Sequence, residues 1–425
     1  MRSRVLAFVA GLQWLGFMFA NTAVIPLSVG GAFHLSGAAL AGCVARSFVL
    51  TGAACLVQAL FGHRLPLMEG QSGIWWGAIL SIVATLSSSH IPLAEAGGAI
   101  SAGLVVTGLL IMVLGALGIH RALNRIFTPM VMAVLLLLLS VQLIDIFFRG
   151  MFGISDGGTI SLKLGALSIG LALLVGILTV AAKGWLSNFS ILIGIVVGWL
   201  LYARIFGATP VQDPTFATMT QWFAWGPWNL DPGIVGAVIL VGLINITNTI
   251  ATLRAAEMTF APPVSAAQYR RSFISTGAVT AIAGVFAAVP YAPYTSSIGF
   301  LRTTRIYDRA PFLIGAALFT AIGLVPSLTG FFATLPVGVG DAVLFIAYLQ
   351  LFGSAMQTLE GVTFTFRTIF RLAVPALTGL AVLSLPAGTF ANLPGFWQVV
   401  LGNGMLVGIL LSLVLENVVK WEKYA

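Results

Sequence analysis

Long apolar segments separated by short polar intervals follow one another along nearly the whole chain. Apolar runs of about 18 or more residues are typical of transmembrane helices, because a helix of that length crosses the hydrocarbon core of a bilayer. The predicted spans are residues 6–28, 38–61, 66–88, 98–118, 127–148, 161–182, 185–206, 234–254, 271–289, 290–306, 311–329, 333–353, 368–387 and 394–416. The sequence therefore predicts an all-α polytopic membrane protein with fourteen transmembrane segments.

Two of these spans are interrupted. The third begins with the Gly-rich and polar stretch 66–77, and the tenth contains Pro290 and Pro293 followed by the hydroxyl-rich stretch 294–297. Proline removes a backbone N–H, and serine and threonine hydroxyls compete with helical hydrogen bonds. In lipid, irregular backbone is tolerated only where it is buried in protein or lines a cavity. We therefore expect an extended entry and then a half-helix starting near Ser297, whose N–H groups face a site at mid-membrane depth.

The two interruptions occupy matching positions in an internal repeat. The first span begins near residue 8 and the eighth near residue 234, and the same offset of about 226 carries Ser72 to residue 298. Two halves of seven spans have opposite topology, and paired interruptions in inverted halves indicate a substrate site at their interface. Close packing of Gly-rich spans is the alternative, but it does not account for the paired proline and serine clusters.

The composition excludes a soluble domain of this length. The chain is 59% hydrophobic and 8% charged, with a mean hydropathy of +1.05. Its formal net charge of +8 is explained by a positive-inside bias rather than by nucleic acid. With the N-terminus in the cytoplasm, only Arg149, Lys163 and Arg204 fall outside, and Arg46 lies within a span. Both termini are then cytoplasmic, and the longest polar interval, 207–232, is an extracytoplasmic connector.

Several stretches resemble one transporter family. They are the first-span run with Gln13-Trp14, Met68-Glu69-Gly70 before the third span, Asn245-x-x-Asn248-Thr249 in the eighth, the tenth-span run from Ser296 to Arg305, Phe127-Thr128-Pro129 and Leu335-Pro336. In these the chain resembles the nucleobase–ascorbate transporters, also called nucleobase:cation symporters of the second type. The likeness covers essentially the whole chain and is closest to the bacterial purine permease branch.

The resemblance implies a fold of seven plus seven inverted spans. A core domain would comprise residues 1–125 and 233–330, and a gate domain residues 126–232 and 331–425. Two short antiparallel strands, in the broken spans three and ten, would meet at the substrate. The resemblance also implies a homodimer formed through the gate, a location in the bacterial cytoplasmic (inner) membrane, and a proton gradient as energy source without a cofactor.

The chain departs from the family at the positions that bind the nucleobase. The glutamate usual in span eight is replaced by Ile244, with Asn245 next to it, and the polar or acidic position four residues later is Asn248. In the tenth-span signature, the acidic or glutamine position is Ser296 and the asparagine position is Ser297. Energy coupling in this chain therefore cannot use those two carboxylates.

A nucleobase is a flat, neutral ring with alternating donors and acceptors, so its site needs apolar faces and a few convergent polar groups. Asn245 and Asn248 are three residues apart and share a helix face, and their amides can read an –NH–CO– edge. Hydrogen bonding between helices is the alternative role. The other expected substrate-binding residues are Gln13, Ser72, Gly73, Ser296, Ser297 and Tyr294, with Trp75, Trp76 and Phe300 as further candidates to cover the ring.

Glu69 is the acidic residue nearest to the expected site, whereas most others fall in loops or at span ends. Arg46 lies in the middle of the second span, where an unpaired charge is costly. We therefore expect Glu69 and Arg46 to pair, and Glu69 to be the proton carrier. A purely structural ion pair is the alternative.

The sequence predicts a secondary active transporter that takes up a nucleobase by proton symport through alternating access. A purine such as xanthine, guanine or hypoxanthine is the first expectation, and uracil the next. The alternatives are a proton-independent facilitator and an anion transporter of the related seven-plus-seven folds. An enzyme is not expected, because His34, His63, His90 and His120 lie at span ends and neither HExxH nor a nucleophile elbow occurs.

Overall fold

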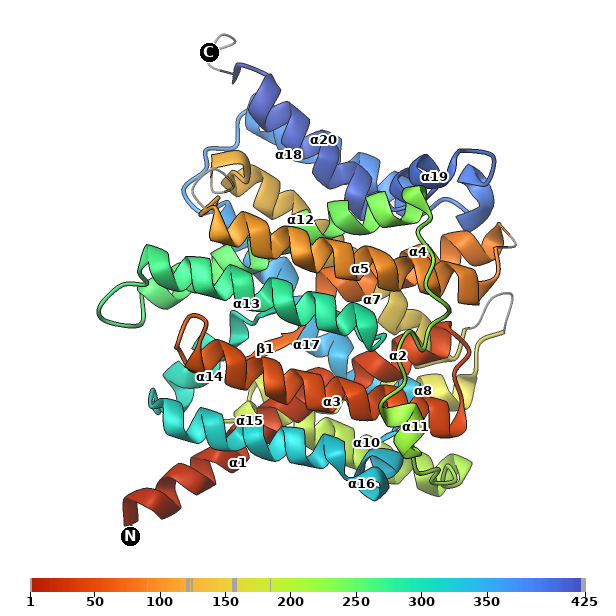
Figure 1. Cartoon of the computed structure of the whole chain (residues 1–425), viewed down its shortest axis with the longest axis vertical. Coiled ribbons are helices and arrows are strands. Elements are labelled where there is room, and N and C mark those ends of the chain that lie inside the picture. Colours follow the sequence, from red (N-terminus) through yellow and green to blue (C-terminus); the bar gives the residue numbers. More distant parts are fainter. Residues whose placement is uncertain are drawn as a thin grey trace.

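The computed structural model describes residues 2–89, 91–119, 123, 125–154, 159–183 and 185–421, so His90 and His120 lie outside the described residues. The helices lie roughly side by side and follow one another along the longest axis of the molecule, with the two chain ends near opposite ends of that axis (Figure 1). The helices and strands are α1 (Arg2–Thr22), α2 (Val24–Ala32), α3 (Gly37–Leu60), β1 (Glu69–Gln71), α4 (Gly73–Ser88), α5 (Leu93–Ala116), α7 (Pro129–Phe152), α8 (Leu162–Val180), α9 (Trp185–Asn188), α10 (Ser190–Phe206), α11 (Phe216–Met219), α12 (Pro232–Glu257), α13 (Ala266–Val285), β2 (Tyr291–Pro293), α14 (Ser296–Thr304), α15 (Arg309–Leu324), α16 (Pro326–Phe332), α17 (Val337–Thr358), α18 (Phe366–Leu383), the 3₁₀ helix η1 (Ala387–Phe390), α19 (Gly395–Leu401) and α20 (Gly404–Val418).

Each predicted span contains helix, but not every one holds a straight helix of spanning length. Within the described ranges, eight helices are long and apolar enough to cross a bilayer, or ten if each bent pair is one span. The bent pairs are α15 with α16, at 92°, and α19 with α20, at 86°. Helices α4 and α10 are shorter apolar helices. A polytopic helical membrane fold is thus confirmed, whereas the count of fourteen spans stays a prediction.

The helices pack in two groups. The first group contains α1 to α5 and α12 to α16, in which α5 packs on α13 and α12, and α15 packs on α3 and α1. In Figure 1 the helices α5, α13, α3 and α15 follow one another in this order. The second group contains α7 to α10 and α17 to α20, in which α7 packs on α17 and α20 packs on α18.

Small residues let the helices of the first group approach closely. A Cβ added at Gly108 on α5 would lie 2.4 Å from the backbone nitrogen of Ala281 and 2.5 Å from the carbonyl oxygen of Gly277, both on α13. No side chain fits between backbones at that distance, which is typical of helix interfaces in membranes. The glycines therefore fix α5 against α13.

The two interrupted segments meet in the interior as a pair of antiparallel strands. Gly70 of β1 lies opposite Ala292 of β2. The pairing continues beyond the strands, because the N–H of Ser72 donates to the carbonyl of Pro290 and that of Tyr294 to the carbonyl of Met68, each at 2.8 Å. One residue separates β1 from α4, and two residues separate β2 from α14. The predicted strands are thus confirmed, and the half-helix starts at Ser296, one residue before the predicted position.

Candidate functional site

Helix α12 closes the open edge of β2 with side chains. The Asn245 amide nitrogen donates to the carbonyl of Tyr291 at 3.2 Å, and the Thr252 hydroxyl donates to the carbonyl of Pro293 at 2.9 Å. Buried backbone carbonyls need a partner, and here two side chains stand where a third strand would donate. Asn245 and Thr252 are themselves buried. The position of β2 is therefore fixed by α12.

The same asparagine links α12 to the start of α4. The Ser72 hydroxyl donates to Oδ1 of Asn245 at 2.6 Å, and the Asn248 amide nitrogen lies 3.2 Å from that oxygen and 3.1 Å from Oγ of Ser72. Ser72 also caps α4, because its Oγ accepts from the N–H of Ile74. The two asparagines share one helix face as the spacing predicts, and the structure places both beside Ser72. Both polar atoms of the Asn245 amide have protein partners, whereas Oδ1 of the half-buried Asn248 accepts no hydrogen bond from the part of the chain that the structure describes.

The pleat of β1 gives the strand pair two different faces, because successive side chains point to opposite sides. Gly70 lies under Tyr294, and a Cβ added there would be 2.8 Å from two carbons of the tyrosine ring. We call this side the Gly70 face. The Tyr294 hydroxyl donates to the carbonyl of Gln71, which holds the ring in place.

The other side, which we call the Glu69 face, is turned toward α3. The Gln71 amide nitrogen donates to the Ser47 hydroxyl at 3.2 Å, and the Tyr291 hydroxyl lies 3.4 Å from the carbonyl of Ser47. Gln71 and Tyr291 are both fully buried. Helix α3 therefore covers this face with polar groups that contact buried side chains of both strands.

Glu69 points into the first helix group from the Glu69 face. The Thr276 hydroxyl on α13 donates to its Oε1 at 2.7 Å. The Gln58 amide nitrogen on α3 donates in turn to that hydroxyl at 2.9 Å and to the carbonyl of Ser272 at 3.1 Å. The second carboxyl oxygen, Oε2, is buried and has no hydrogen-bond partner in the described ranges. The Glu69 side chain thus leaves β1 on the side away from Tyr294.

The expected pair of Arg46 with Glu69 is wrong. Arg46 is buried, and its Nε donates to the carbonyl of Phe286 at 2.7 Å while its Nη1 donates to the carbonyl of Thr218 in α11. Cys55, whose sulfur contacts the backbone of Glu69, lies nine residues further along α3, about 14 Å away. Carbonyls at the end of α13 and in the connector thus accept from two of the three guanidinium nitrogens, and pairing with backbone carbonyls is a common solution for a cation at membrane depth.

The remaining predicted residues divide into those that contact the strands and those that do not. The Ser297 hydroxyl accepts from the N–H of Met68 at 3.0 Å, which joins the two interrupted segments. Gly73 faces the second helix group, because a Cβ there would lie 3.3 Å from Leu143 and 3.5 Å from Tyr348. Gln13 is half-buried and Ser296 is exposed, and neither side chain makes a hydrogen bond with another described residue.

Tyr348 of α17 lies beside the candidate site, and the sequence did not indicate it. Its side chain interacts with that of Tyr294 across the two helix groups. The Tyr348 ring also lies edge-on to Trp76 and Phe147, with centroids 6.2 and 5.4 Å apart, and Trp76 and Phe147 are themselves 5.1 Å apart. Thr276 and Gln58 were missed as well. One polar side chain in an apolar span carries no signal that separates a site from packing.

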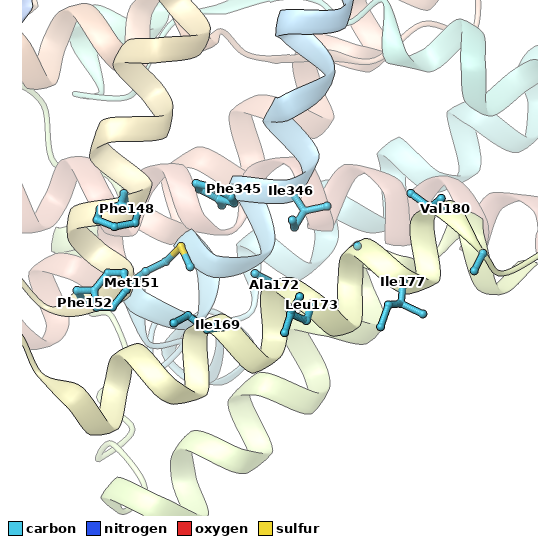
Figure 2. A pocket seen from close by; sticks show the side chains of 12 residues that line it. Phe148, Met151, Phe152, Ile169, Ala172, Leu173, Ile177, Val180, Phe345 and Ile346 are labelled. Carbon is cyan, nitrogen blue, oxygen red and sulfur yellow. The ribbon is translucent and has the colours of Figure 1, made fainter.

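Two large cavities lie away from the strands. One has a volume of ≈ 550 Å³ and is lined by α7, α8 and α17, with Phe148, Leu173 and Phe345 among the apolar side chains around it (Figure 2). The other, of ≈ 610 Å³, lies between α1, α10 and α16. A nucleobase site needs convergent polar groups, which the first cavity lacks, and neither is lined by a predicted site residue. The strand pair with α12 remains the candidate site.

Comparison with known proteins agrees with this architecture. "Putative purine permease YwdJ" of Bacillus subtilis is 26% identical over 98% of this chain and 96% of its own. "Uric acid permease PucK" of the same organism is 24% identical over 96% and 94%, and "Xanthine permease", also of that organism, is 23% identical over 96% and 92%.

Among solved structures, the transmembrane domain of a cyanobacterial bicarbonate transporter, BicA, superimposes with a TM-score of 0.65, at 16% identity and 96% coverage of both chains. The murine Slc26a9 anion transporter gives a TM-score of 0.64 at 12% identity, covering 97% of this chain and 68% of its own. At these identities the structural likeness concerns the fold alone.

The family assignment rests on a match between this sequence and a family model. The model of the Permease family matches residues 6–388, which confirms the resemblance carried by the first-span and tenth-span motifs. Proteins of this family, and the relatives above, are membrane permeases and not enzymes. The chain therefore belongs to the Permease family, that of the nucleobase–ascorbate transporters.

Proposed function

We propose that this protein is a secondary active transporter that takes up a nucleobase by proton symport. A purine such as xanthine, guanine or hypoxanthine is the first candidate substrate, and uracil is the next. Uric acid is added as a candidate because a relative is named as a uric acid permease, beside one named as a xanthine permease. The observation that carries the proposal is the neutral polar cluster of Asn245, Asn248 and Ser72, placed where a strand pair meets the start of a half-helix.

The chemistry of this cluster fits a neutral heterocycle. Asn248 is half-buried and offers an amide that can both donate and accept, which matches the –NH–CO– edge of a nucleobase. Tyr294, Tyr348 and Trp76 supply aromatic surface for the ring faces. An anion carrier is the second candidate, because the starts of α4 and α14 are half-helix N-termini that favour negative charge. Against an anion, the buried cation Arg46 already donates hydrogen bonds to two backbone carbonyls.

Transport would proceed by movement of one helix group against the other. We assign the first helix group as the core that carries the site, corresponding to residues 1–125 and 233–330 to within two residues, and the second as the gate, corresponding to 126–232 and 331–425. Gly73 against Leu143, and Tyr294 against Tyr348, are the contacts that such a movement would open. Dimerisation through the gate, an inner-membrane location and cytoplasmic termini complete the proposal.

Glu69 is the proton carrier in this proposal. Of the described residues, Glu69 and Asp341 are buried acidic residues outside any ion pair, and only Glu69 lies on the strand pair. A charged carboxylate there would lack a cation to offset its desolvation, so loading a proton allows it to stay buried. A facilitator that works without protons is the alternative.

Uptake of radiolabelled xanthine, guanine, hypoxanthine, uric acid and uracil tests the proposal, in cells that lack their own carriers and with or without a protonophore. Saturable uptake of one base that the protonophore abolishes is the expected result. Uptake that survives the protonophore would indicate a facilitator. Absence of uptake for every base, together with sulfate or bicarbonate transport, would replace the nucleobase by an anion.

A further inference from the structure

We propose that the proton and the nucleobase use opposite faces of the strand pair, so that the proton reaches the cytoplasm through the core, between α3 and α13. Thr276 and Gln58 act as positioning residues for Glu69 on this route. The inference rests on the proposed function, because it concerns how that transporter exchanges its proton.

The alternation of side chains in β1 is the first argument. Gly70 lies under Tyr294, which in turn contacts Tyr348 of the second helix group, so the Gly70 face is turned toward the gate. Glu69 points to the opposite side and hydrogen bonds with Thr276. A substrate held between core and gate therefore cannot touch the Glu69 carboxyl without disrupting the strand pair.

The second argument is a set of buried polar atoms around Gln58. Oε2 of Glu69, Oγ of Ser272 and Nε2 of His63 are all buried, and none has a hydrogen-bond partner in the described parts of the chain. Gln58 links two of these residues through their backbones, since its Nε2 donates to the carbonyl of Ser272 and its Oε1 accepts from the backbone N–H of His63 at 3.4 Å. Buried polar atoms of this kind are normally satisfied by ordered water, and water can carry a proton past Gln58.

The third argument is that this cluster ends at a surface. The carbonyl of His63 accepts from the Gln268 side chain at 2.7 Å, and Gln268 belongs to the first turn of α13, capped by the exposed Ser265. Arg64, next to His63, is exposed too. This end of α3 and α13 is the predicted cytoplasmic side, so the route from Glu69 to the cytoplasm does not pass the Gly70 face.

The proton balance is simple. The O–H bond of the neutral Glu69 carboxyl breaks, the proton passes to water beside Ser272, and a carboxylate remains until the next proton arrives from outside. Nδ1 of His63 accepts from the N–H of Leu65 at 3.0 Å, so the neutral ring carries its proton on Nε2. His63 therefore orients water as a donor and does not itself take the proton.

The titratable neighbours of Glu69 are few. Cys55 contacts its backbone from α3, and Tyr291 lies on the same face from β2. From α13, neutral groups approach the cluster: the Thr276 hydroxyl, the carbonyl of Ser272 and the Gln268 amide. At the cytoplasmic end, Arg309 of α15 donates to the carbonyl of Ala59.

Thr276→Val tests the inference, with Thr252→Val as a matched control. Both threonines are buried and donate to the strand pair, Thr276 to Glu69 and Thr252 to the backbone of Pro293. In proteoliposomes, nucleobase exchange without a gradient and accumulation driven by a proton gradient are measured, with proton influx followed by an internal pH dye. For Thr276→Val we expect at least a tenfold loss of accumulation and of proton influx, with the KM of exchange within twofold of wild type.

Thr252→Val should reduce exchange and accumulation together. Thr276→Ser should restore accumulation and its pH profile, which a purely structural loss would not predict. Ser272→Leu, which fills the route nearer to the cytoplasm, should slow proton influx and spare exchange. Equal loss of exchange and accumulation in folded Thr276→Val or Ser272→Leu protein would overturn the inference, and so would wild-type accumulation in both. If wild-type protein itself shows exchange but no proton-driven accumulation, the proposed symport fails instead.

Discussion

Replacement of Gly70 by alanine tests whether the ring of Tyr294 must lie directly on the strand pair. A Cβ at this position would lie 2.8 Å from Cε1 and Cζ of Tyr294 and 3.0 Å from Cε of Met68. Carbon atoms in favourable contact are about 3.5 to 4.0 Å apart, so the ring or the strand has to move. The ring is not free to do so, because its hydroxyl donates to the carbonyl of Gln71.

The size of the effect depends on which group moves. If the strand shifts, the cost is that of overpacking a buried site, about 1–3 kcal/mol. If the ring moves, the hydrogen bond to Gln71 is lost, which costs about 1 kcal/mol, or a factor of about five in a binding constant. We therefore expect Gly70→Ala to weaken nucleobase binding at least about fivefold and to lower the thermal unfolding temperature.

Equilibrium binding of the labelled nucleobase and thermal unfolding in detergent measure both effects. Gly170→Ala is the matched control, since a Cβ at Gly170 on α8 would meet no atom within 4 Å. The control is expected to bind and unfold as wild type does. Wild-type affinity and stability in Gly70→Ala protein would refute the assignment of Tyr294 to the substrate face.

Three further predictions concern the contacts around the site and the gate. Arg371→Met leaves the Glu416 side chain, which is 2% exposed, without its two 2.6 Å hydrogen bonds, so about 3 kcal/mol of stability should be lost. Thermal unfolding should show that adding Glu416→Gln restores most of this stability. No recovery in the double variant would contradict the ion-pair explanation. Asn245→Ala leaves a buried carbonyl unpaired and should cost about 1–3 kcal/mol of stability, whereas Asn248→Ala should raise the KM of exchange with little change in unfolding. Arg46→Met removes the donors to the carbonyls of Phe286 and Thr218, so limited proteolysis from the outside should cut the connector faster than in wild-type protein.

Much of the fold could be predicted from the sequence because lipid restricts the choice of structure. Apolar length located the long helices, and a Gly-rich polar stretch and a proline- and hydroxyl-rich stretch located the two extended segments. The bends were not predictable, because an apolar run has the same hydropathy whether its helix is straight or turns by 92°, as α15 and α16 do before and after Val325. The number of spans therefore depends on backbone geometry that hydropathy does not contain.

The candidate site was predictable in part. A spacing of three residues places Asn245 and Asn248 on one face, and the repeat offset places Ser72 near β2, so these residues meet. Their role in binding stays a prediction. The pairing of Arg46 with Glu69 failed because two charges in neighbouring spans need not lie at one depth, and unpaired carbonyls are invisible in a sequence.

The two strands are held with different strength, and this decides where coupling between proton and substrate can occur. Strand β2 is anchored on α12 by the amide of Asn245 and the hydroxyl of Thr252. The outer edge of β1 is instead held by the sulfur of Cys55, which lies 3.3 Å from the N–H and 3.5 Å from the carbonyl of Glu69. Sulfur is a weak donor and acceptor, so β1 can shift at lower cost than β2. Since Glu69 and the carbonyl that holds Tyr294 belong to this same strand, a shift of β1 on protonation of Glu69 would move the aromatic ring on the opposite face.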